Sequence, residues 1–137
     1  MPFVLDASIT VAWAFADEGH PTAAVARERL RAEEAHVPSL WWYEVRNALI
    51  VNERRRRLTE ADTTLFLRGL SRLPIAVDRD PEEFRLLTLS RRHRLTVYDA
   101  AYLELAQRGD LPLATLDAAL VRAARLEKVA IMDQSTE

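Results

Sequence analysis

The N-terminal stretch Phe3-Val4-Leu5-Asp6-Ala7-Ser8 is the strongest indication of the fold. Three consecutive apolar residues that end at an acid are typical of a short strand buried on both faces. Residues from Ala7 to Ala16 then show helical spacing. A buried strand that leads directly into a helix predicts an α/β protein in which Asp6 lies at the carboxyl end of the strand.

The same alternation of short apolar runs and longer helical patterns continues along the chain. Strands are predicted at Phe3–Leu5, His36–Val37, Ile75–Val77, Leu113–Ala114 and Val129–Ile131. Helices are predicted at Ala7–Ala16, Pro21–Glu34, Leu40–Arg55, Glu60–Leu73, Pro81–Arg92, Tyr98–Arg108 and Ala118–Arg125. Strands separated by helices imply parallel pairing and a sheet that is covered on both faces.

Length and composition limit the class of protein. A chain of 137 residues, 49% hydrophobic and 29% charged, is expected to form a single globular domain over residues 1–137. The absence of cysteine excludes disulfides and cysteine-based zinc sites. No apolar run is long enough to cross a membrane and the N-terminus lacks the basic region of a signal peptide, so we expect a cytoplasmic protein.

The net charge of −2 does not by itself suggest a nucleic-acid binder, which is usually basic. Two bound divalent cations would make the total positive, and the distribution of charge matters more than its sum. The run Arg54, Arg55, Arg56 and Arg57 suits contact with phosphates, because a guanidinium binds them in a bidentate manner. A solvated helix end near a negative dipole explains the same run equally simply.

Three acids stand where a parallel sheet places its ligands, beyond strand ends or in the first turn of a helix. Asp6 and Asp117 each follow a predicted strand and precede a helix. Asp99 follows Thr96 at the spacing of a capping box. Helix capping and a shared functional site are both open interpretations for each of these acids.

Glu44 has no capping explanation, because it lies in the middle of the helix predicted at Leu40–Arg55. At about 100° per residue it falls inside the apolar arc of that helix, and Asn47 lies at the edge of the arc. A buried, ionised carboxylate without a partner costs several kcal/mol. Glu44 therefore requires either an ion pair with an arginine or a metal ion shared with other acids.

Four segments together resemble the PIN-domain family and, within it, the VapC-type toxins of bacterial toxin–antitoxin pairs. They are Val4-Leu5-Asp6-Ala7-Ser8, then Pro38 to Glu44 with Asn47 and Leu49, then Thr96 to Ala106, and Leu111 to Asp117. The resemblance covers essentially the whole chain, in order and at family spacing. It implies a three-layer α/β fold with a mostly parallel five-stranded sheet flanked by helices.

The resemblance also implies an endoribonuclease that depends on Mg²⁺ or Mn²⁺, forms a homodimer and is neutralised by a small VapB-like antitoxin. By position, Asp6, Glu44, Asp99 and Asp117 are the catalytic, metal-binding acids, with Thr115 and Asn47 in support.

Two alternative functions remain. A receiver-like module that accepts a phosphoryl group needs a lysine at a late strand end, and the only lysine, Lys128, precedes its strand. The other is a non-catalytic PIN-like interaction domain.

Overall fold

One parallel sheet organises the chain in the computed structural model, which describes residues 1–133 apart from the side chain of Ala16. Its strands are β1 (Phe3–Leu5), β2 (Ala35–Pro38), β3 (Ile75–Asp78) and β4 (Leu113–Ala114). Their order is β3-β2-β1-β4, and each neighbouring pair is parallel. The carboxyl ends of the strands therefore meet at one edge of the sheet.

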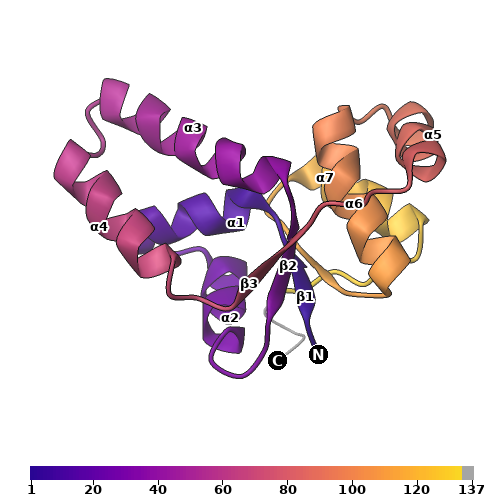
Figure 1. Ribbon diagram of the computed structural model, residues 1–137, viewed down its shortest axis with the longest axis horizontal. Coiled ribbons are helices and arrows are strands. Elements are labelled where there is room, and N and C mark those ends of the chain that lie inside the picture. The colour runs from indigo at the N-terminus through magenta and orange to yellow at the C-terminus, as the bar shows by residue number, and fades with distance from the viewer. Residues whose placement is uncertain (134–137) are drawn as a thin grey trace.

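Helices cover both faces of this sheet (Figure 1). The helical elements are α1 (Ala7–Ala12), the 3₁₀ segment η1 (Trp13–Glu18), α2 (Pro21–Arg29), α3 (Leu40–Arg54), α4 (Glu60–Leu70), α5 (Glu83–His93), α6 (Val97–Gly109) and α7 (Ala118–Leu126). Figure 1 shows α1 to α4 on one side of the strands and α5 to α7 on the other. The predicted three-layer α/β fold is confirmed.

The expectation of five strands is wrong, because the described part of the chain forms a four-stranded sheet. The segment Val129–Ile131 makes a single bridge to β4: the N–H of Leu113 donates to the Ala130 carbonyl and the N–H of Met132 donates to the Leu113 carbonyl, both at 2.9 Å. Longer pairing would need a longer β4. That strand ends at Ala114, after which Thr115 turns its side chain toward Asp6.

The first helix is shorter than predicted and continues as a 3₁₀ segment. Phe15 lies outside helical geometry, with φ −125° and ψ 55°. Two packing contacts hold the kink: the Trp13 indole N–H donates to the Ala23 carbonyl at 2.8 Å, and the Arg57 guanidinium lies 4.3 Å from the centre of the Phe15 ring. Tertiary contacts thus override the local helical pattern.

A continuous apolar core lies under both helical layers. The three residues of β1 are fully buried, and α6 supplies the largest set of buried side chains of any helix, Ala100 to Ala106. Within residues 1–133, the structure contains no helix with the length and apolar character that a membrane crossing requires. The core fixes α1, α3, α6 and α7 against the edge of the sheet where the acids lie.

Candidate active site

Asp6 is the most buried of the four acids. Its N–H donates to the Ala114 carbonyl at 3.0 Å, which fixes it between β1 and β4. Its side chain makes no capping hydrogen bond to α1, although Asp6 is the residue before that helix. Instead, Oδ2 accepts hydrogen bonds from the hydroxyls of Ser8 at 2.6 Å and Thr115 at 2.7 Å. Capping therefore does not explain this carboxylate.

Burial raises the pKa of Asp6 above its ordinary value, and the negative charge of Asp99 raises it further. The hydrogen bonds from Ser8 and Thr115 oppose this increase in pKa without cancelling it. The two hydroxyls are themselves fixed by backbone: Oγ of Ser8 accepts from the N–H of Leu116, and Oγ1 of Thr115 accepts from that of Asp117, each at 3.0 Å. Asp6 is held rigidly in an environment that disfavours its charge.

Glu44 projects from α3 toward Asp6 and is half-buried. Its Oε1 accepts a hydrogen bond of 2.6 Å from the Tyr102 hydroxyl on α6. Burial raises the pKa of Glu44, the Tyr102 hydrogen bond lowers it, and the charges of Asp6 and Asp99 raise it. No arginine forms an ion pair with Glu44 in the region the structure describes, so the ion-pair interpretation is wrong.

Tyr102 is fully buried, and burial together with the charge of Asp6 raises its pKa, which keeps its hydroxyl a donor. The tyrosine joins α6 to α3 across the site. Neither Tyr102 nor Ser8 was predicted as a site residue. A signal was present in both cases, because Ser8 lies two residues after Asp6 and Tyr102 shares a helical stripe with Asp99.

Asp99 and Asp117 complete the cluster from the starts of two helices. In the first turn of α6, the N–H of Asp99 donates to Oγ1 of Thr96 at 3.0 Å, as predicted for a cap. Burial raises the pKa of Asp99, and so does the charge of Asp117. Asp117 caps α7, since its Oδ1 accepts from the N–H of Leu120 at 3.0 Å. Asp117 is therefore both a helix cap and an electrostatic neighbour of Asp99.

The other predicted residues differ in their surroundings. Thr115 contacts Asp6 directly, which agrees with a supporting role. Asn47 is exposed one turn beyond Glu44 and has no hydrogen bond to the four acids in the described structure. Arg54, Arg55 and Arg56 are exposed at the end of α3, about 15 Å along the helix from Glu44.

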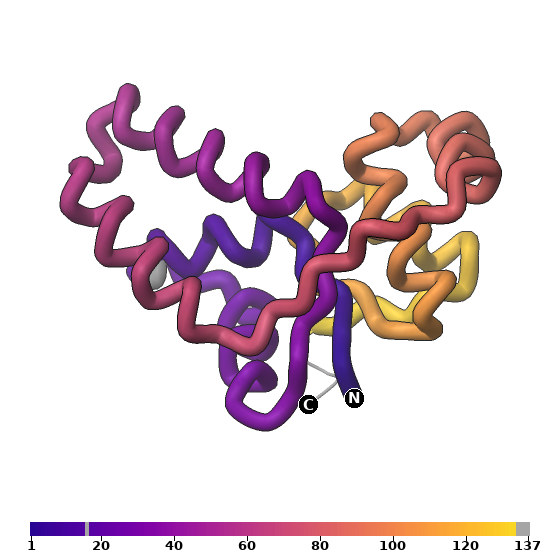
Figure 2. Tube along the Cα trace, in the orientation of Figure 1, coloured from indigo at the N-terminus to yellow at the C-terminus, as the bar shows by residue number. Residues whose placement is uncertain are grey.

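Arg57 is committed to a structural contact. It forms an ion pair with Glu18, stacks on Phe15 and donates to Oδ1 of Asn52 at 3.0 Å. Figure 2 shows the turn between α3 and α4 at the tip of a long hairpin, well away from the edge of the sheet. The arginine run therefore lies apart from the acids, and one of its members is occupied.

The donor set suits a magnesium or manganese ion, since all of it is carboxylate oxygen and the charges repel one another. Among residues 1–133, no three acidic or histidine side chains converge on a single point as direct ligands. The arrangement fits a hard cation that takes one or two carboxylates directly and retains several waters, which is the usual behaviour of Mg²⁺.

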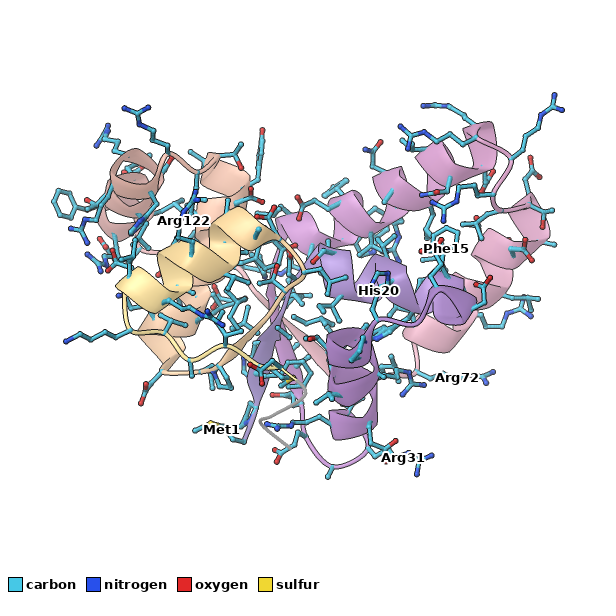
Figure 3. All side chains as sticks on the ribbon, turned by 180° about the vertical axis from the view of Figure 1, so that it is seen from behind. Met1, Phe15, His20, Arg31, Arg72 and Arg122 are labelled. Carbon is cyan, nitrogen blue, oxygen red and sulfur yellow. The ribbon has the colours of Figure 1, made fainter. Side chains whose placement is uncertain are left out.

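Two cavities lie on the α1–α4 side of the sheet, one on each flank of η1. One, of about 580 Å³, is lined by η1 and the α3–α4 turn, with Phe66 and Leu65 of α4 on its wall. The other, of about 490 Å³, lies between η1 and α2 and is mainly apolar. Figure 3 labels Phe15, which lines both cavities, and His20, which lines the second.

Known proteins share the sequence pattern and fold of this chain. The family model described as PIN domain matches residues 3–126. Ribonuclease VapC3 from Pyrobaculum aerophilum is 34% identical over 120 residues, which are 85% of this chain and 90% of that protein. The crystal structure of PAE2754 from Pyrobaculum aerophilum superposes with a TM-score of 0.75 at 26% identity and covers 99% of this chain and 91% of that chain. FitAcB from Neisseria gonorrhoeae has the same fold, with a TM-score of 0.59 at 16% identity over the full length of both chains. The chain belongs to the PIN-domain family.

Proposed function

We propose that this protein is a divalent-metal-dependent endoribonuclease, the toxin of a VapBC-type toxin–antitoxin pair. The observation that carries the proposal is the electrostatic coupling of four carboxylates from separate elements, three of them with raised pKa values. Buried carboxylates that repel one another destabilise the folded chain. Their presence therefore points to a function that requires them. The name of the relative, Ribonuclease VapC3, supports RNA as the substrate. The proposal includes a cytoplasmic location, where the toxin would meet cellular RNA.

In this proposal Asp6, Glu44, Asp99 and Asp117 would hold Mg²⁺ or Mn²⁺, one or two of them directly and the others through bound waters. When bound, the cation lowers the pKa of a water molecule and neutralises charge on the scissile phosphate. Ser8 and Thr115 fix the Asp6 carboxylate, and Tyr102 orients Glu44. In this proposal water attacks the phosphorus in line, the P–O bond to the leaving oxygen breaks, and the proton released by the water is balanced by one that the leaving oxygen takes up. No covalent intermediate forms on the protein. The substrate is a structured RNA with an exposed loop, where unpaired bases can be reached.

Purified protein is expected to cleave RNA in Mg²⁺ or Mn²⁺ and to lose that activity in excess EDTA, because carboxylates alone repel the phosphate. Mapping the new 5′ ends in total RNA measures both activity and cut site. Restoration of activity by added Mg²⁺ is the control for damage by EDTA. Metal-independent cleavage would overturn the cofactor proposal. Absence of cleavage in every metal would favour the non-catalytic PIN-like alternative, and the family match already disfavours a receiver-like module.

The partner in this proposal is a small VapB-like antitoxin that places an amphipathic segment in the two cavities beside η1. The cavity lined by η1 and the α3–α4 turn carries Asp17 and Asp62 as well as aromatic rings, and the other cavity is mainly apolar, which together suit a segment with both basic and apolar side chains. Co-expression with the adjacent gene is expected to yield a stable complex. Leu65→Asp, on the cavity wall, is expected to lower the affinity of this complex at least tenfold. Glu60→Gln, on the exposed surface of the same helix, is the matched control. Failure of any small protein to co-purify would refute this role.

Two further parts of the proposal concern surfaces. A homodimer is supported by exposed apolar side chains on α3, where Trp42, Tyr43 and Ile50 are 48%, 71% and 40% exposed. Light scattering measures this stoichiometry.

The proposal also includes contact between RNA and the exposed arginines Arg54, Arg55 and Arg56. It leaves out Arg57, because this residue already pairs with Glu18.

A further inference from the structure

The outer surface of α7 leads away from the acids and ends in a basic region. Its inner face is buried through Leu120, Ala123 and Ala124. Its outer face forms a shallow hollow of about 560 Å³, which is lined by Ala118, Val121, Arg122, Arg125 and Leu126. The hollow begins next to Asp117, the acid that caps this helix. Because α7 has nine residues, it extends about 13 Å from the acids.

The arginines of this hollow are exposed and have no ion-pair partner among residues 1–133. By contrast, Arg85 and Arg92 at the far end of α7 are engaged, because both pair with Glu127. Arg122 and Arg125 lie three residues apart and therefore on the same helical face. Two free guanidiniums on one face constitute a site for an anion with repeated charge.

The basic region at the far end of α7 comes from two helices. Glu127, directly after α7, binds Arg92 and His93 in the last turn of α5 and brings the two helix ends together. Arg91, Arg94 and Lys128 lie beside these residues in the sequence and are exposed. The charge on Glu127 is already shared by Arg85, Arg92 and His93, so the region is positive overall.

We propose that the outer face of α7 binds the sugar–phosphate backbone of the RNA on one side of the scissile bond. This inference rests on the proposed nuclease function. Arg122 and Arg125 contact successive phosphates, and the apolar floor of Val121 and Leu126 accommodates the riboses. Ala118, which follows Asp117 directly in the sequence, lines the end of the hollow nearest the acids. RNA is favoured over a protein segment because the free charges of the hollow are all basic and because the hollow begins at Ala118, directly after Asp117.

The test measures binding rather than cleavage, so it does not depend on the nuclease proposal. Fluorescence anisotropy of a fluorescein-labelled, 12-nucleotide single-stranded RNA in EDTA gives the binding constant over a series of salt concentrations. The plot of log K against log salt has a negative slope, and the double variant Arg122→Ala with Arg125→Ala is expected to make it shallower by about 1.4. The reason is that about 0.7 counterions are released per phosphate contact on a single strand, and two contacts are lost.

The matched control is Arg68→Ala with Arg72→Ala, which removes the same charge from exposed positions around the end of α4. Figure 3 labels Arg122 and Arg72 on opposite sides of the molecule. The control is expected to keep the wild-type salt slope. Arg122→Lys with Arg125→Lys should have a slope close to that of the wild type, since lysine keeps the charge. An unchanged slope in the α7 alanine variant, or an equal loss in the control, would overturn the inference. Loss of the co-expressed partner with an unchanged RNA slope would assign this face to a protein instead.

Discussion

Asp6→Asn is expected to abolish Mg²⁺-dependent RNA cleavage and to raise the thermal stability of the protein at pH 7. The loss of activity should be about 10³-fold or more, since a cation at this site contributes several kcal/mol to the transition state. Asparagine keeps an acceptor oxygen for Ser8 and Thr115, so the local hydrogen bonds can persist. Cleavage-end mapping and thermal denaturation measure the two effects.

The gain in stability follows from the direction of the pKa shift. Burial raises the folded-state pKa of Asp6 above its ordinary value of 3.8, so ionised Asp6 disfavours the folded state as pH rises above that value. The asparagine variant lacks this penalty. At pH 7 and without metal its melting temperature should be higher by about 3 °C, equivalent to roughly 1 kcal/mol, and the gain should vanish near pH 3. Mg²⁺ should stabilise the wild type more than the variant.

Asp80→Asn is the matched control, because Asp80 is exposed in the loop before α5 and outside the cluster. It should leave activity and melting temperature unchanged. Asp99→Asn should reproduce the loss of cleavage with a smaller change in stability, since Asp99 is less buried than Asp6. Normal cleavage by either the Asp6 or the Asp99 variant would contradict the assignment of the site. A lower melting temperature for Asp6→Asn would show that its hydrogen bonds outweigh the cost of its burial.

Local patterns were sufficient to locate the acids but not to describe how they are held. Glu44 could be predicted because a carboxylate in an apolar arc requires a partner, whichever partner it finds. Tyr102 could not be chosen as that partner, because the contact joins residues 58 positions apart. The same limit applies to Thr115, which contacts Asp6 across 109 positions and was named only from the family resemblance.

The errors in the predicted fold have a related origin. Val129–Ile131 has the composition of a strand, but pairing depends on the length of β4, which ends where Thr115 turns toward Asp6. Ala7–Ala16 has the spacing of one helix, but contacts of Trp13 and Phe15 with distant segments break it. Sequence periodicity reports the average burial of a segment. It does not report which distant residue will take a particular hydrogen bond.

Glu127 is the clearest case of a group that sequence reasoning missed, and its removal should destabilise the fold strongly. Its side chain is 8% exposed and accepts hydrogen bonds from Arg85 at 3.0 Å, Arg92 at 2.7 Å and Gln107 at 3.4 Å, besides its 2.6 Å contact with His93. The side chain of His93 is likewise 8% exposed. One carboxylate thus joins α5 and α6 to the end of α7, the helix that begins at the acidic site.

Glu127→Gln should lower the melting temperature at pH 7 by about 7 °C, equivalent to roughly 2 kcal/mol for a chain of this length. This loss of stability lies between the losses measured when exposed and fully buried ion pairs are broken. Arg85 and Arg92 are partly exposed, so their guanidiniums regain water when Glu127 is removed. Cleavage at 20 °C should persist, because Glu127 lies at the opposite end of α7 from Asp117. Glu28→Gln, which breaks an exposed pair with Arg31, is the control and should change the melting temperature by less than about 2 °C.

The pH dependence separates the charge of Glu127 from its packing. Burial raises its pKa, but the hydrogen bonds from His93, Arg92 and Gln107 and the charge of Arg92 lower it to about 2. The folded-state pKa is thus below the ordinary value of 4.5, so the carboxylate stabilises the fold above pH 4.5 and loses this effect as pH falls toward 2. The difference in melting temperature between wild type and Glu127→Gln should therefore narrow from pH 7 to pH 3. A difference in melting temperature that stays constant over this range would mean that Glu127 acts through its packing rather than its charge. If Glu127→Gln melted at the wild-type temperature at pH 7, Glu127 would have no stabilising role.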